Sequence, residues 1–199
     1  MQCSHIIRTV IKIGDYGNKK GTRLAQRHTD VFIDSEVKGI DHLMTDKWLC
    51  QITDSALTLL NVPESKSIEI AITDDKTMRD LNLRHLGIDS TTDVLSFPNI
   101  NSPNTDLNTD LLSTEKAQDK YKFIGEVVIS SPEAGRQSLD KGISFTQEIA
   151  FLLGHGILHL LGHDHETEDE RIEMEIAHRK ILLAMLGKSG MSIEVKYPA

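Results

Sequence analysis

Residues 146–165 read TQEIAFLLGHGILHLLGHDH, a stretch that is apolar on nearly every side of a predicted helix. A helix that is hydrophobic all round belongs in the interior of a globular protein. We therefore expect a helix that begins near Thr146 and runs through the middle of the core. Gly162 is expected to end this helix, because glycine readily adopts the left-handed conformation that turns the chain back.

Three histidines in this stretch have the spacing of a metal site. His155 and His159 are four residues apart, so their imidazoles project from one face of the helix. The turn at Gly162 brings His165 back toward the same point. Three imidazoles with a fourth position open to water are typical of catalytic zinc sites. We therefore predict His155, His159 and His165 as ligands of one ion per chain, expected to be Zn²⁺, although other first-row divalent metals suit the same ligands.

The spacing H-x3-H-x2-G-x2-H is also that of metzincin peptidases, which use a glutamate directly after the first histidine as general base. Here that position is Gly156, which has no side chain to accept a proton. A peptidase mechanism would thus need a carboxylate from another segment. The neighbouring His163 is expected to point away from the ion if His165 is the ligand.

The rest of the chain alternates predicted strands and helices. The last helix is expected to place Ile172, Ile176, Ile181 and Met185 on its apolar face. The pattern as a whole predicts an α+β fold, with a small four-stranded mixed sheet packed with about five helices and the metal site at the end of a core helix. The expected strands are 31–33, 67–73, 93–98 and 125–130, and the expected helices are 41–60, 74–86, 131–142, 146–161 and 167–187.

The length of 199 residues fits one domain with appendages. We expect residues 1–29 to form a basic, partly disordered extension, residues 30–190 a single metallohydrolase domain, and residues 191–199 a C-terminal tail. The alternatives for residues 1–29 are an organellar targeting segment and an arm that contacts RNA. Residues 99–120 are expected to form a long polar loop.

The net charge of −8, from 30 acidic and 22 basic side chains, disfavours binding of nucleic acid by a generalised positive surface. Residues 1–29 are the exception, because six basic side chains and one acid give this segment a net charge of +5. A nucleic-acid substrate would therefore need a local site.

We expect a cytoplasmic protein, organellar if the source is eukaryotic, with neither membrane nor DNA as a partner. No apolar run approaches the roughly 18 residues of a membrane span, and no secretory signal is recognisable. Cys3 and Cys50 lack the spacing of a metal site or a disulfide framework, which favours a reducing compartment.

Residues 154–165, GHGILHLLGHDH, resemble the signature of the YbeY family of metal-dependent endoribonucleases, H-G-x-L-H-L-x-G-[YH]-D-H. Two further blocks agree in content and order. They are Leu81-Asn82 followed by TDVLSFP at 92–98, and GEVVIS at 125–130 ahead of a helix with Ala134 and Gln137. The resemblance covers about residues 31–187 and places His155, His159 and His165 at the three ligand positions.

This resemblance implies a single-strand-specific endoribonuclease that hydrolyses phosphodiester bonds during rRNA maturation and ribosome quality control. The implied partners are rRNA of the small ribosomal subunit and ribosome-associated proteins. The alternatives are a zinc metallopeptidase-like hydrolase and a non-catalytic ribosome-assembly factor whose ion only stabilises the fold.

The chain departs from the family pattern at two places. The family usually has an aromatic residue and an arginine where this chain has His85 and Leu86, and Arg84 stands two residues before Leu86. Glu126 occupies a position that is usually aspartate. The catalytic base and the groups that contact phosphate are therefore left unassigned.

Overall fold

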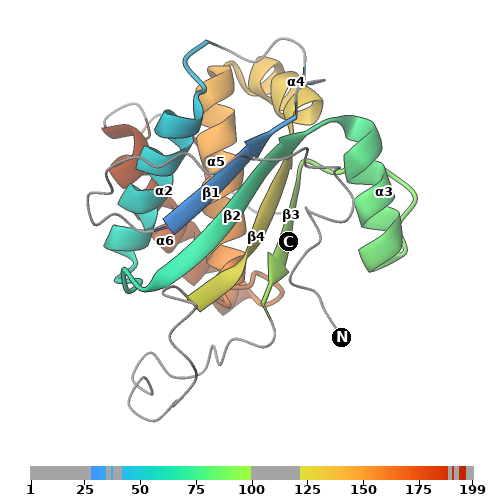
Figure 1. The fold of residues 1–199 in the computed structure, drawn as a ribbon. Helices are drawn as coiled ribbons and strands as arrows, with labels where there is room; N and C mark the ends of the chain where they lie inside the picture. The colour runs from blue at the N-terminus through green and yellow to red at the C-terminus, as the bar shows by residue number, and fades with distance from the viewer. Residues whose placement is uncertain are drawn as a thin grey trace, which may run out of the picture.

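The computed structural model describes residues 28–34, 37, 42–99, 122–187, 190 and 193–195 (Figure 1). The predicted extension up to residue 27 and most of the predicted polar loop lie outside these residues. The strands are β1 (His28–Ile33), β2 (Lys66–Thr73), β3 (Val94–Pro98) and β4 (Lys122–Ser130). The helices are α2 (Asp46–Leu59), α3 (Asp75–Leu86), α4 (Ser131–Lys141), α5 (Phe145–Leu160) and α6 (Glu168–Leu186).

The four strands form one mixed sheet in the order β1-β2-β4-β3. The pairs β1–β2 and β2–β4 are parallel, whereas β3 runs antiparallel to β4 at the edge. This confirms the predicted α+β fold with a four-stranded mixed sheet. One extra residue of β4, Ile124, bulges between the pairs Ser67–Phe123 and Ile68–Gly125.

The two faces of the sheet are covered differently (Figure 1). The alternating Ile68, Ile70 and Ile72 of β2 belong to the large core under α2, α5 and α6, as the period-two pattern predicted. On the other face, Met78 and Leu81 of α3 pack on a smaller cluster with Ala71, Leu95 and Val128. Helix α5 therefore lies on the opposite side of the sheet from α3.

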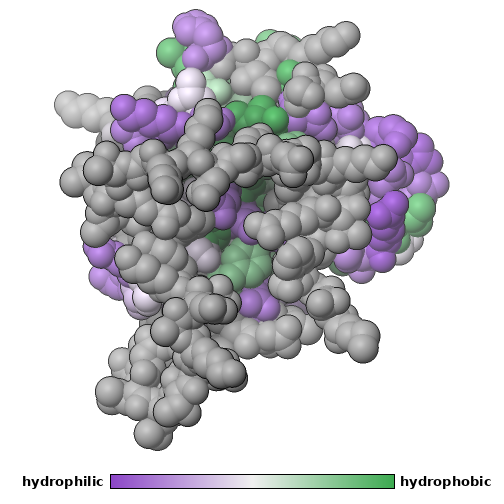
Figure 2. All heavy atoms as spheres, in the orientation of Figure 1, coloured by the Kyte–Doolittle hydropathy of each residue, from purple (hydrophilic) through white to green (hydrophobic). Residues whose placement is uncertain are grey.

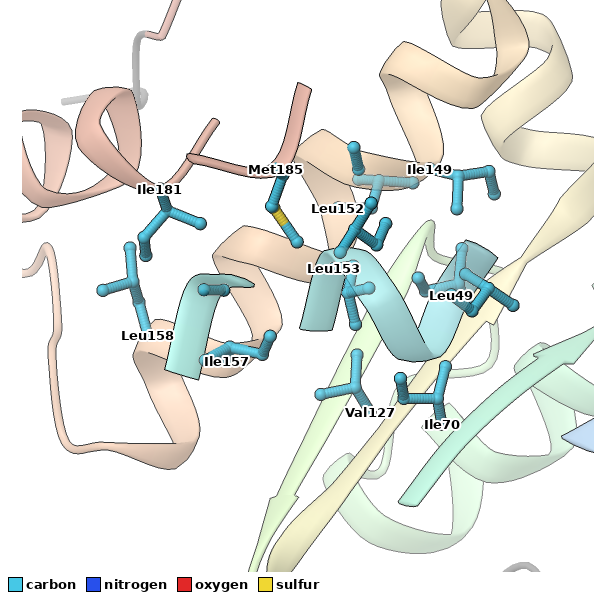
Figure 3. Close-up of a cluster of buried hydrophobic side chains, with 14 of the residues drawn as sticks. Leu49, Ile70, Val127, Ile149, Leu152, Leu153, Ile157, Leu158, Ile181 and Met185 are labelled. Atoms are coloured by element: carbon cyan, nitrogen blue, oxygen red, sulfur yellow. The ribbon is translucent and has the colours of Figure 1, made fainter. Parts of the chain in front are cut away.

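Helix α5 passes through the large core, as its apolar sequence predicted. Leu153 and Ile157 are fully buried, and Figure 3 shows their side chains among those of Leu49 from α2, Val127 from β4 and Ile181 from α6. The helix begins at Phe145, one residue before the predicted start. Ser144 caps it in a capping box with Gln147.

Two predictions about the helices were wrong in detail. Residues 42–45 precede α2, which starts at Asp46, because the Thr45 side chain accepts the Trp48 N–H and caps the helix there. In α6, Ile172 and Ile176 are 44% and 50% exposed, so they do not form the core face. The buried face is instead made of Met174, His178, Ile181, Leu182 and Met185.

The packing of the core extends past residue 190. Ile193 and Val195 are buried members of the large core cluster. These two residues therefore pack with the domain, although the sequence placed them in a C-terminal tail.

The surface around α3 is mainly hydrophilic in Figure 2, with scattered hydrophobic side chains. Leu83, Leu86 and Ile88, at the end of α3 and just beyond it, are about half exposed. Within the described part of the chain, every helix is too short or too polar to span a bilayer.

His178 is a fully buried polar residue in the middle of α6. Burial, together with repulsion from a charged His155, lowers its pKa to about 3, so the ring is neutral in the folded protein at neutral pH. In the unfolded chain a histidine titrates near pH 6.5. Below that pH the unfolded state therefore takes up a proton that the folded state does not.

Acidification should destabilise the metal-free protein through this residue. The unfolding free energy should fall as the pH drops from about 6.5 toward 3, by up to about 1.4 kcal/mol per pH unit for one histidine. Denaturant unfolding of wild type and His178→Gln at pH 7, 6 and 5, with chelator present, measures this dependence. At pH 5 the variant should take up about one proton fewer than wild type on unfolding. If the unfolding free energies of the two proteins have the same slope against pH, His178 is not the group responsible.

Truncation inside the large core should destabilise the whole domain. Leu153→Ala removes a fully buried side chain from α5 and should lower the unfolding free energy by about 2–5 kcal/mol. Leu183→Ala is the matched control, because Leu183 lies on α6 and is 46% exposed. Chemical denaturation should show a change below about 1 kcal/mol for the control; a similar loss in both variants would mean that α5 is not central to the core.

Candidate metal centre

His155 and His159 occupy the last two turns of α5 and lie one turn apart on the same face. Their Nε2 atoms are 3.1 Å apart, and their ring centroids are separated by 4.5 Å. Two ligands of a tetrahedral zinc ion, each about 2.0–2.1 Å from the metal, would be about 3.3 Å apart. The two nitrogens therefore already have the spacing of two ligands of one ion.

The end of α5 brings the third histidine to this pair. Gly162 has φ +87°, and its N–H donates to the His159 carbonyl at 3.0 Å, while the His163 N–H donates to the Leu158 carbonyl at 3.0 Å. These two bonds are the Schellman closure of a helix, which requires a left-handed residue at the glycine position. The ring of His165 then lies 5.6 Å from that of His155 and 5.3 Å from that of His159.

One nitrogen from each of His155, His159 and His165 lies within 4.8 Å of the others. These are the three residues that the sequence predicts as ligands. Three imidazoles are a donor set that suits Zn²⁺ and other first-row divalent ions, so the residues fit a metal centre. His163 is not a member of this group among the described residues.

Gly156 lies where α5 touches the sheet. A Cβ atom at this position would lie 2.6 Å from Val127 Cγ1 and 3.1 Å from Ser96 Oγ. Ser96 Oγ also donates to the Gly156 carbonyl at 3.2 Å. There is no room for a side chain between α5 and the sheet at Gly156, so a glutamate at this position would collide with Val127.

Gly154 lies on the other side of His155, where α5 touches α6. A Cβ atom there would lie 2.9 Å from Nε2 and 3.1 Å from Cδ2 of His178. Gly154 and Gly156, on either side of His155 in the sequence, both lack a side chain. Helix α5 can therefore come into van der Waals contact with the sheet on one side and with helix α6 on the other.

Burial and mutual repulsion favour neutral ligand histidines. The pKa of His155 is lowered to about 4, first by burial and then by the proximity of His159 and His165. The pKa of His159 is also lowered, mainly by burial and next by His165. A neutral imidazole is the form that binds a metal ion, so at neutral pH these two residues need not lose a proton on binding.

A polar network links the start of β3 and helix α4 to helix α5. The Asp93 carboxylate accepts the Val94 N–H at 2.8 Å and a Gln137 Nε2–H at 2.9 Å, and its charge opposes the lowering of the His155 pKa. Lys141 joins Gln137 to the buried carboxylate of Glu148 with bonds of 3.1 and 2.8 Å. The network ties the start of β3 and helix α4 to α5, two turns before His155.

Sequence reasoning found the three histidines but missed their supports. Asp93 and Ser96 belong to the recognised TDVLSFP block, although no role had been assigned to either. The only indication of a buried His178 in the sequence is its helical spacing from two apolar residues. It lies four residues after Met174 and seven before Met185, on the buried face of α6.

The acidic run after the ligands lies on the surface. Glu166, Glu168, Asp169 and Glu170 are exposed, and Glu168 forms an ion pair with Arg171 at 2.6 Å. These side chains therefore form a solvated surface at the start of α6. Glu168 is therefore engaged by Arg171 on its own helix.

The positions that depart from the family pattern lie on the α3 side of the sheet. The His85 ring packs edge-on against Phe97, with centroids 4.9 Å apart, and Leu86 is 60% exposed. Glu126 is 1% exposed and in register with Glu69 and Phe97, on the same face as Val128. Glu126 thus points to the face opposite α5, away from the histidines.

Comparison with known proteins extends the family resemblance. The family described as Endoribonuclease YbeY matches residues 31–186. Curated relatives with the name Endoribonuclease YbeY include one from Thermoanaerobacter sp. (strain X514), 32% identical over 77% of this chain and 95% of the relative. Another, from Shouchella clausii, is 33% identical over 79% of this chain and 98% of the relative.

The fold is also found among solved structures. The solution structure of TM1509 from Thermotoga maritima aligns with a TM-score of 0.50 at 19% identity, over 80% of this chain and 90% of that one. At this identity the likeness supports the fold alone. Because the family match spans most of the chain, and the relatives are matched over nearly their whole length, the chain belongs to the YbeY endoribonuclease family.

Proposed function

We propose that the protein is a metal-dependent endoribonuclease in which His155, His159 and His165 hold one divalent ion, with Zn²⁺ as the expected metal. The observation that carries the proposal is the convergence of three imidazole nitrogens within 4.8 Å at the end of α5. Membership of a family named for endoribonuclease activity supplies the class of reaction.

A divalent ion at this point would polarise a phosphoryl oxygen and lower the pKa of water toward about 7. The chain's own contribution is to hold three imidazoles at a fixed spacing, two of them with lowered pKa values. Because Gly156 leaves no space for a general base on α5, we expect positioning and electrostatic stabilisation to supply most of the catalysis.

The substrate that suits this protein is single-stranded rRNA, cleaved during maturation and quality control of the small ribosomal subunit. A net charge of −8 supports weak non-specific binding to nucleic acid. Specificity would then come from the ribosome and its associated proteins, which implies work in the cytoplasm or in an organelle. The domain that performs the reaction would be the segment 30–190, with residues 1–29 as a basic extension.

Loss of one ligand should abolish both metal binding and RNA cleavage. His159→Ala removes a ligand, whereas His163→Ala removes a histidine outside the group and is the matched control. Calorimetry should show that wild type and His163→Ala each bind one Zn²⁺. Added Zn²⁺ should also raise their Tm, and at a free Zn²⁺ concentration of 100 times Kd it should raise the free energy of unfolding by about 2.7 kcal/mol. His159→Ala should show neither effect.

Cleavage of an rRNA precursor by the same three proteins, at the same protein and total Zn²⁺ concentrations, tests the activity. We expect multiple-turnover cleavage by wild type and His163→Ala and a loss of about a hundredfold or more in His159→Ala. Equal cleavage by all three would point to a contaminating nuclease. Metal binding without turnover would instead favour a non-catalytic assembly factor, and chelator-sensitive cleavage of peptides would favour a peptidase.

A further inference from the structure

His178 lies in the core directly behind the candidate metal centre. It belongs to α6, on the opposite side of α5 from the sheet, and its ring centroid is 6.1 Å from that of His155. The ring also packs against Phe151 at 4.6 Å. No ligand role follows from this position, because His178 is not part of the three-histidine group.

The ring of His178 makes one directed contact with α5. Its Nε2–H donates to the Phe151 carbonyl oxygen at 2.9 Å. In an α-helix the carbonyl of residue 151 also accepts the N–H of residue 155. The same oxygen therefore receives the backbone N–H of the ligand His155 and the side-chain N–H of His178.

The contact depends on the glycine before the ligand. Gly154 leaves the space that the His178 ring fills, since a Cβ atom there would lie 2.9 Å from Nε2. On the other side, Gly156 rests against Val127 and Ser96. The backbone around His155 is thus held between the sheet and a hydrogen-bonding ring of α6.

We propose that His178 is a positioning residue for the metal centre, which fixes the turn of α5 that carries His155 so that its imidazole meets those of His159 and His165. This inference rests on the proposed function, because it concerns the geometry of the proposed ligands. His178 acts through the Phe151 carbonyl and through packing on Gly154, and it does not touch the ion.

The test is the Zn²⁺ affinity of purified full-length variants, measured by competition with a chromophoric chelator. His178→Leu keeps an apolar side chain but loses the donor, and should weaken Zn²⁺ binding by about tenfold or more, the range seen when groups that orient ligands are removed. His178→Gln places an amide N–H the same number of bonds from the backbone as Nε2–H. It should restore an affinity close to that of wild type.

Leu182→Ala is the matched control for lost packing. Leu182 is fully buried on the same face of α6, one turn beyond His178, so its truncation should lower Tm. Its Zn²⁺ affinity should remain that of wild type. If His178→Leu lowers Tm but binds Zn²⁺ as tightly as wild type, His178 only packs the core and the inference is wrong.

A double-mutant cycle with Gly154 gives a second test should His178→Leu fold poorly. Gly154→Ala pushes a methyl group against the His178 ring and should weaken Zn²⁺ binding in the wild-type background. In a His178→Ala background the two contacts with the ring are gone and only the 3.3 Å contact with Ile181 Cγ2 is left, so the same change should have a much smaller further effect. Additive losses would overturn the inference, whereas failure of wild type itself to bind Zn²⁺ would overturn the metal centre as well.

Discussion

The close approach of α5 to its neighbours on both sides is the constraint on which the rest of the structure depends. At Gly156 the helix touches Val127 and Ser96 of the sheet, and at Gly154 it touches His178 of α6. A methyl group at either position would lie within 3 Å of a neighbouring atom. His155 stands between these two contacts, so the packing that buries the helix also fixes the first ligand of the candidate centre.

The same packing explains the chemistry that the chain can and cannot perform. A glutamate after His155, which peptidases with this spacing use as a base, would collide with β4. The histidines are partly buried, and burial lowers the pKa values of His155 and His159, so both are neutral and ready to bind a metal near neutral pH. A metal centre without an adjacent base would suit reactions in which the ion and the positioning of substrate dominate, as in phosphodiester cleavage.

Much of this arrangement could be predicted from local sequence patterns. The alternating isoleucines of β2, the apolar length of α5 and the helix-ending Gly162 each follow from a short-range rule, and each was confirmed. The spacing of His155, His159 and His165 likewise predicted three ligands, and their nitrogens do converge.

The predictions that failed concern features decided by contacts between distant segments. The predicted apolar face of α6 included Ile181 and Met185, which are buried, but wrongly added Ile172 and Ile176. His178 is polar, so a hydrophobic pattern does not place it on the buried face, although it lies there. Ser96, 60 residues before its partner Gly156, likewise could not be recognised as a support of the centre.

We propose that His155, His159 and His165, at the end of α5 and just beyond it, bind a single metal ion. X-ray absorption spectroscopy of the Zn²⁺-loaded full-length protein tests it most directly. We expect three nitrogen ligands of imidazole type at about 2.0–2.1 Å and one further oxygen ligand. A spectrum with sulfur in the first shell, or with a shell made mainly of oxygen, would contradict it.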